Sequence, residues 1–236
     1  MSTFNPYTAP GTSHSPPLPS GVHGAYGESY VPLRWRTVLA AIAVFGVTLT
    51  GFGMHLAQVL LGERLKSSVA AGSPDFAAVA LMGLTGFAVL AASACAWVFV
   101  PVWMYRAAAN LRGLGRHGMV FSPGGCAGWF FVPIASLWKP VQAMSEIWRA
   151  SNPQADELDW DTSSGTPLIA VWWSAWIMSN IVSLVALAAQ SSPADQGSIG
   201  LASNALSAVA AVALVMLMRG VSARQEQAIA RLNGNG

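Results

Sequence analysis

Residues 76–105 decide the fold, and they read FAAVALMGLTGFAVLAASACAWVFVPVWMY. This stretch contains no Asp, Glu, Lys or Arg across 30 consecutive residues. A helix rises about 1.5 Å per residue, so roughly 20 residues cross the hydrocarbon core of a bilayer, which is about 30 Å thick. Backbone N–H and C=O groups in lipid must be paired within the segment, and this favours a helix over a strand. The stretch therefore predicts a membrane-spanning helix.

Three further segments lack the same four residue types, namely 37–62, 162–194 and 196–218. The whole chain of 236 residues is 53% hydrophobic and only 9% charged, whereas about a quarter of the residues in a soluble domain are charged. Its formal net charge of +2 is small for a nucleic-acid-binding surface, so nucleic acid is not expected as a partner. We expect an all-α membrane protein whose four transmembrane helices occupy about 37–61, 76–104, 167–190 and 197–218.

The basic residues indicate how these helices are oriented. With four spans, ten Lys and Arg residues fall on one side of the membrane, and only Arg64 and Lys66 fall on the other. Segment 117–138 also lacks formal charge, but Gly and Pro interrupt it, and a fifth span there would divide the basic residues five against seven. The side richer in Lys and Arg is normally cytoplasmic. We therefore expect a multi-pass protein of the cell membrane with both termini in the cytoplasm.

The N-terminal residues 1–33 differ from the rest of the chain. They contain six prolines, four glycines and five serines but a single charged residue, Glu28. Such a segment cannot bury a core, so it predicts a disordered cytoplasmic tail. The tail is either a flexible spacer or a docking segment for a partner protein. Residues 34–232 form the predicted transmembrane domain.

The loop between the second and third spans carries two further helix signals. Apolar residues recur at helical spacing from Ala107, which predicts that the second helix continues beyond the membrane as far as Gly113. Residues 139–151 have an amphipathic pattern with a proline in the first turn, which predicts a short helix at the interface. The whole segment 122–151 is expected to be interfacial or shallowly re-entrant, because Gly and Pro break its first half.

Basic and aromatic side chains interleave along this loop and form the candidate functional site. Each basic residue near an anionic membrane surface contributes about 1 kcal/mol to binding. Trp and Tyr rings favour the depth of the lipid headgroups. We expect the loop to contact anionic headgroups or an unidentified partner protein, unless its basic residues are only topology anchors. The candidate residues are Arg106, Asn110, Arg112, Arg116, Trp129, Pro133, Trp138, Lys139, Pro140, Glu146, Trp148 and Arg149.

Two of these candidates, Glu146 and Arg149, lie three residues apart on one predicted helix. We expect both side chains to face water or each other. Such a pair contributes only about a few tenths of a kcal/mol to helix stability. We therefore expect Glu146→Ala to leave assembly of the protein intact.

Several strings of this loop and of the third span resemble one known family. They are YRAAANLRGLG at 105–115, FSPG at 121–124, GWFFVPIA at 128–135, LWKPVQAM at 137–144, EIWRAS at 146–151 and WWSAWIMSN at 172–180. Together they are similar to the bacterial, largely actinobacterial, membrane proteins grouped as domain of unknown function 4328. The resemblance implies a multi-pass bacterial membrane protein with a Pro/Gly-rich tail. It implies no activity, substrate or catalytic residue.

Polar and small residues inside the predicted spans are candidates for packing contacts or for a permeation path. Small residues recur four apart in the third span at Ala175, Ser179 and Ser183, and in the fourth at Ser203, Ser207 and Ala211. We expect a tight antiparallel hairpin of these two spans through Ser179, Ser183, Ser207 and Ala211. Small residues four apart allow membrane helices to approach closely. His55 lies in the first span, and we expect it to hydrogen-bond a neighbouring helix, with a ligand or proton-relay role as the alternative.

The sequence shows no nucleophile paired with a base and no phosphate-binding loop. Cys95 and Cys126 lie in separate apolar segments without C-x-x-C spacing, which argues against a disulfide framework and a zinc site. We expect no enzymatic activity, no cofactor and no metal, and we interpret the chain as a scaffold or regulatory membrane component. The alternative is a small-solute transporter or channel subunit with a cavity beside segment 122–138, because broken backbone at membrane depth normally lines a cavity.

Overall fold

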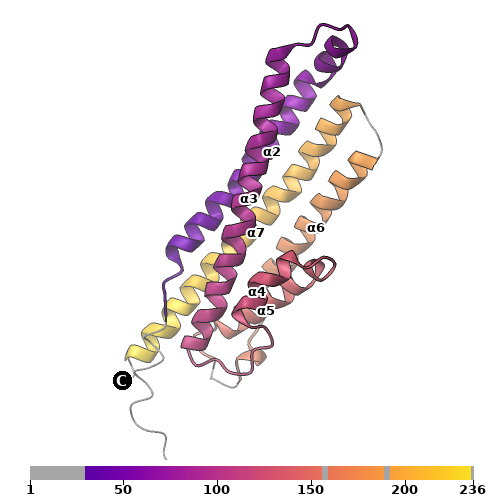
Figure 1. Cartoon of the computed structure of the whole chain (residues 1–236). Coiled ribbons are helices and arrows are strands. Elements are labelled where there is room, and N and C mark those ends of the chain that lie inside the picture. The colour runs from indigo at the N-terminus through magenta and orange to yellow at the C-terminus, as the bar shows by residue number, and fades with distance from the viewer. Residues whose placement is uncertain (1–29, 156–158, 189–191, 235–236) are drawn as a thin grey trace, which may run out of the picture.

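The structure is a computed structural model, and it describes residues 30–155, 159–188 and 192–234 (Figure 1). Four helices in these ranges are long and apolar enough to cross a membrane, which confirms the predicted all-α membrane fold. Residues 1–29 of the predicted tail lie outside the described residues, so disorder there stays a prediction. The long helices are α2 (Arg34–Ala70), α3 (Phe76–Gly113), α6 (Pro167–Ala188) and α7 (Pro193–Gly234).

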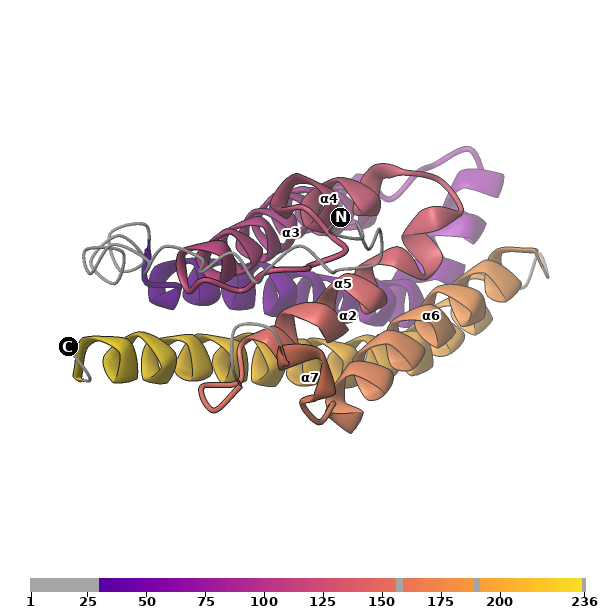
Figure 2. The same cartoon turned by 90° about the horizontal axis from the view of Figure 1, so that it is seen from below.

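The four long helices form one layer in which α2 and α7 are the inner pair. α2 packs along α3 and α7, and α6 packs along α7. α3 and α6 are therefore the two edge helices of the layer (Figure 2). α7 is the most buried of the four, since 44% of its most apolar stretch is buried, against 17% for α2 and α6 and 6% for α3. Outward side chains such as Leu49, Leu90 and Leu187 are exposed, which suits contact with lipid.

The two ends of the layer differ. The start of α2, the end of α3, the start of α6 and the end of α7 lie at one end, which we call the basic end (Figure 1). This end carries all the Lys and Arg residues of the sequence except Arg64 and Lys66. At the opposite end, the α2–α3 hairpin extends beyond the α6–α7 hairpin. An exposed ion pair closes its tip, where Arg64 Nε lies 2.9 Å from Asp75 Oδ2.

Short elements connect α3 to α6. They are α4 (Pro123–Gly128), η1 (Trp129–Phe131), η2 (Ala135–Leu137), α5 (Lys139–Ala150) and η3 (Trp160–Thr162). α5 is the predicted amphipathic helix, and its first turn contains the expected proline. α5 contacts α3, α6 and α7, so it closes the gap between the two edge helices at the basic end (Figure 2).

Local sequence explains where the helices begin and end. Asp75 starts α3 by accepting a hydrogen bond from the Ala78 N–H at 3.1 Å. Ser122 starts α4 by accepting one from the Gly125 N–H at 3.0 Å. α3 ends at Gly113, as its apolar spacing predicts. α2 and α7 extend past their predicted spans, because charged residues mark a membrane boundary but do not end a helix.

α6 and α7 form the predicted antiparallel hairpin, but in a different register. Ser203 Oγ donates to the Ser179 carbonyl at 2.8 Å and lies 2.8 Å from Ser183 Oγ. The seam therefore runs through Ser203. The hydrogen bond of Ser183 goes to Ser203, one helical turn before Ser207. Ser207 and Ala211 border the same cavity as Ser179, Ser183 and Ser203. Spacing of small residues alone does not specify this register.

His55 has a different partner from the predicted one. Its Nδ1 lies 3.1 Å from Gln58 Oε1 on the same helix, so the expected bond to a neighbouring helix is corrected. The imidazole instead packs on Gly200 of α7, where an added Cβ would overlap the ring. A glycine at this point allows α2 and α7 to approach closely.

Engineered cysteine pairs test the α6–α7 register. In a background with Cys95 and Cys126 replaced by serine, Ser183→Cys with Ser203→Cys should form a disulfide under mild oxidation. The two hydroxyls lie 2.8 Å apart, which places their Cβ atoms within bridging distance. The pair Ser183→Cys with Ser207→Cys should stay reduced. Mobility on a non-reducing gel measures both, and cross-linking of 183 to 207 in preference to 203 would contradict the register.

Candidate functional site

Asn110 of α3 joins several segments at the basic end. Its side chain is fully buried. Asn110 Nδ2 donates to the Val31 carbonyl at 2.9 Å and to Gln225 Oε1 at 3.1 Å, and the Val31 N–H donates back to Asn110 Oδ1 at 3.1 Å. Gln225 Nε2 donates to the Ala107 carbonyl at 3.0 Å and to Ser151 Oγ at 3.2 Å. These bonds connect α3, α7, the segment before α2 and the end of α5, and we call Asn110, Gln225 and Ser151 the polar core.

A second buried contact lies nearer to the predicted membrane boundary. Trp103 Nε1 donates to Thr37 Oγ1 at 2.9 Å, and Thr37 Oγ1 lies 3.1 Å from Ser222 Oγ. The contact joins α3, α2 and α7. Because Thr37 begins the first predicted span and Trp103 lies next to the end of the second, this contact marks the membrane boundary that the sequence predicts.

Arg116 is buried, and its guanidinium caps the end of α5. Nε donates to the Ala150 carbonyl at 3.2 Å, Nη1 to the Ala155 carbonyl at 2.6 Å and Nη2 to the Asn152 carbonyl at 3.0 Å. The last carbonyls of a helix lack helical partners, and a cation there is also favoured by the helix dipole. The expectation that Arg116 faces lipid is corrected, because its donors point into the protein.

Glu146 is also buried, so the prediction that it faces water or Arg149 is wrong. Its carboxylate accepts hydrogen bonds from the Val120 N–H at 2.5 Å and the Phe121 N–H at 3.0 Å. This contact, which we call the Glu146 clamp, holds the loop after α3 against α5. Cys126 of α4 is fully buried nearby. Burial, and after it the negative charge of Glu146, raise the pKa of the Cys126 thiol to about 12.

Trp148 and Pro140 lie in the interior as well. The Arg224 guanidinium of α7 lies 3.8 Å from the centroid of the Trp148 ring, a cation–π contact, and donates to the Trp148 carbonyl at 3.3 Å. Gly220 leaves room for the ring, because an added Cβ would lie 2.7 Å from Trp148 Cζ3. Pro140 is fully buried at the start of α5. The sequence also predicts that Trp148, Pro140 and Asn110 bind lipid or a partner at the membrane surface. This expectation is corrected, because all three side chains are buried.

The other candidates remain accessible. Lys139 Nζ lies 5.4 Å from the centroid of the Phe121 ring and 5.7 Å from that of Trp129. Trp138 is 43% exposed. The half-buried or exposed candidates are Arg106, Arg112, Trp129, Pro133, Trp138, Lys139 and Arg149.

Sequence reasoning missed the part of this site that α7 supplies. Gln225 and Ser222 lie beyond the predicted end of the fourth span at 218, so their contacts with α3 and α2 were not considered. A signal was present, because both residues share a helical face with buried Met218 and Val221. Polar residues on an apolar helical face indicate a buried hydrogen-bonded contact.

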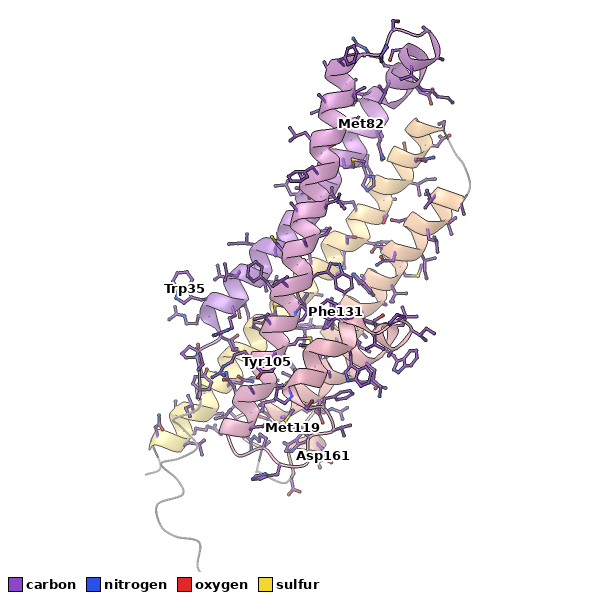
Figure 3. All side chains as sticks on the ribbon, in the orientation of Figure 1. Trp35, Met82, Tyr105, Met119, Phe131 and Asp161 are labelled. Carbon is purple, nitrogen blue, oxygen red and sulfur yellow. The ribbon has the colours of Figure 1, made fainter. Side chains whose placement is uncertain are left out.

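The broken segment between α4 and α5 turns back along α3. The Phe131 ring lies 5.8 Å from that of Trp97, and Figure 3 places Phe131 farther from the basic end than Tyr105. Trp173 Nε1 of α6 donates to the Leu137 carbonyl at 2.8 Å. The segment is therefore held between the two edge helices.

A cavity of about 330 Å³ lies beside this segment, between α3 and α6. α2 and α7 also line it, and Phe130 of η1 borders it. The cavity is partly open and partly enclosed. Its described lining residues include no Asp, Glu, Lys, Arg or His. In the part of the chain that the structure describes, no group of three or more His, Cys, Asp or Glu side chains is placed to hold a metal ion.

The model of one protein family matches this chain. It is described as a domain of unknown function (DUF4328), and the match covers residues 69–223. The matched range contains the whole of α3, α5 and α6, and with them every candidate residue of the loop. No curated protein and no solved structure matches the chain.

Loss of the Glu146 clamp should loosen the basic end. Glu146→Ala should lower the free energy of unfolding by roughly 1–3 kcal/mol, because it leaves the Phe121 N–H buried without an acceptor. Arg149→Ala is the matched control, since Arg149 is exposed on the same helix, and it should change stability little. Thermal unfolding in detergent measures both variants.

Alkylation of Cys126 gives a second, local readout of the same change. In a Cys95→Ser background, Cys126 should react slowly with iodoacetamide, because it is buried and its pKa is raised to about 12. Glu146→Ala should speed this reaction. Equal stability and equal alkylation rates for the Glu146 and Arg149 variants would contradict the clamp.

Proposed function

Since the chain belongs to the DUF4328 family, a domain of unknown function, we propose from its own residues that it is a non-enzymatic scaffold or regulatory protein of a bacterial cell membrane. In this proposal the basic end faces the cytoplasm and contacts anionic lipid headgroups. A partner protein bound at the same surface is the alternative. The observation that carries the proposal is the position of accessible cations at the membrane boundary.

Cations lie close to the depth marked by the Thr37 and Ser222 contact. Arg36 precedes Thr37 on α2, and exposed Arg219 lies one turn before Ser222 on α7. Lys139 follows Leu137, whose carbonyl is bound by α6 near the start of that helix. Each cation near an anionic surface contributes about 1 kcal/mol to binding. These cations support contact with headgroups at the boundary.

Another set of accessible cations lies farther from the membrane. Arg112 follows Trp103 by nine residues on α3, which is about 13 Å along the helix. Arg231 is exposed in the last turn of α7 and follows Ser222 by nine residues, which is also about 13 Å along the helix. Electrostatic attraction in about 0.1 M salt falls off over roughly 10 Å. Arg36 and Arg219 carry the same charge as Arg112 and Arg231, so variants of these two pairs separate contact with headgroups from a general effect of charge.

A pair of double variants tests the proposal. Replacing Arg36 and Arg219 together by Gln should reduce the stabilisation that phosphatidylglycerol gives over phosphatidylcholine in mixed micelles, and should weaken its salt dependence. The matched variant replaces Arg112 and Arg231 by Gln and should keep both effects. Thermal unfolding of the purified full chain measures them. If both variants lose the stabilisation by phosphatidylglycerol to the same extent, the headgroup proposal is overturned and the cations remain topology signals only.

The orientation has its own test. The proposal that both termini are cytoplasmic rests on the asymmetry of basic residues between the two ends of the layer. Reporter fusions after residues 70, 155, 193 and 236 should read outside, inside, outside and inside. An outside reading at the C-terminus would overturn this orientation.

A second candidate function is a small-solute transporter or channel subunit. The cavity between the edge helices favours it, because the cavity lies beside the broken segment as that alternative expects. Phe131 reaches the level of Trp97, about 10 Å inside the predicted boundary at residue 104, which supports a shallow re-entrant segment. The lack of charged groups among the described lining residues argues against coupling to an ion.

A further inference from the structure

Polar side chains line the cavity at mid-membrane depth. Each of the four long helices contributes one such side chain, namely Thr48 from α2, Ser93 from α3, Asn180 from α6 and Ser207 from α7. Each lies within about three residues, or roughly 5 Å, of the midpoint of its predicted span. The cavity therefore offers hydrogen-bonding groups at the depth where a bilayer has none.

Several of these groups are available to a ligand. The hydroxyls of Ser93 and Ser207 make no hydrogen bond to any residue that the structure describes. Asn180 Nδ2 donates to the Trp176 carbonyl at 2.7 Å, which leaves its second N–H. A polar group without a partner in an apolar medium is unfavourable. The site thus presents hydrogen-bond donors that suit a ligand with acceptor oxygens.

Aromatic side chains face the cavity from both edge helices. Trp173 and Trp176 of α6 are stacked, with centroids 4.9 Å apart and an interplanar angle of 30°. Both line the cavity, as do Trp97 of α3 and Phe130 of η1. Aromatic rings prefer offset or edge contacts with other rings, so these walls suit a flat ring. A charged ligand is disfavoured, because the described lining residues supply no counter-charge.

We infer that this cavity binds the ring of an uncharged, membrane-soluble quinone. Ser93, Asn180 and Ser207 donate hydrogen bonds to the ring oxygens, and the tryptophans contact the ring faces. The apolar side chain leaves through the open part of the cavity into the bilayer. A volume of about 330 Å³ fits such a ring, since small-ligand pockets begin at about 300 Å³.

The depth of the polar groups distinguishes a quinone from other lipids. A phospholipid keeps its charged headgroup at the membrane surface and could place only an acyl chain here, which leaves the donors unpaired. An uncharged ring with carbonyl oxygens can lie at mid-membrane depth and pair with them. This site is separate from the cations at the basic end, so the inference does not depend on the headgroup proposal.

Photo-crosslinking tests the inference with the full chain in nanodiscs. The probe is an azido-quinone with a ten-carbon side chain, and labelled peptides are identified by mass spectrometry. We expect label on the stretches of α3 and α6 that line the cavity. Unlabelled decyl-quinone should compete for this site, whereas decylbenzene, which has the ring and chain but no oxygen, should not.

Two variants and one matched control complete the test. Ser207→Phe should abolish the label by filling the cavity, whereas Ser174→Phe, on an exposed part of α6 outside the lining, should retain it. Asn180→Leu should lower labelling about tenfold, as expected for the loss of one hydrogen bond. Asn180→Leu leaves the cavity unfilled, so it still tests the site if Ser207→Phe fails to fold. Label spread over lipid-facing residues, or equal competition by decylbenzene, would overturn the inference in favour of simple filling by lipid chains.

Discussion

The hydrogen bonds of Asn110 are the interaction on which the rest of the structure depends. Asn110 lies beyond the predicted end of the second span, where α3 and α7 meet out of water and each buried polar atom needs a partner. Asn110 and Gln225 find theirs in each other and in main-chain groups of Val31 and Ala107. A shift of one residue in any of these helices would leave an amide unpaired. The polar core therefore specifies the register of α2, α3 and α7, as well as their contact.

Two charged side chains at the basic end, Arg116 and Glu146, stabilise the fold itself and are not free to bind a ligand. α5 has 12 residues, a length at which an isolated helix is only marginally stable in water. Arg116 binds the carbonyls at and beyond the end of α5, and Glu146 of α5 binds the loop after α3. With α5 fixed in this way, the gap between the edge helices is closed at the basic end and stays open nearer the membrane centre. The cavity is thus a consequence of where α5 is held.

The fold could be predicted from the sequence because a long uncharged apolar segment has few possible structures in lipid. The helical spacing of apolar residues was also sufficient to predict α5 and the extension of α3 beyond the membrane. Burial of single polar residues could not be predicted in this way. Arg116 and Arg112 have the same chemistry four residues apart, yet only Arg116 meets carbonyls of the loop after α5. Gln225 and Asn110 are 115 residues apart, so their pairing is a property of the assembled helices.

The unequal lengths of the helices make the protein sensitive to bilayer thickness. α6 has 22 residues and spans about 33 Å, whereas α2 and α3, with 37 and 38 residues, each exceed about 50 Å. A thicker hydrocarbon core can be matched by the long helices, but around α6 the lipid must thin or α6 must become more upright. Such mismatch costs fractions of a kcal/mol per Å. Because α6 is one wall of the cavity, membranes of different thickness should favour different widths of that cavity.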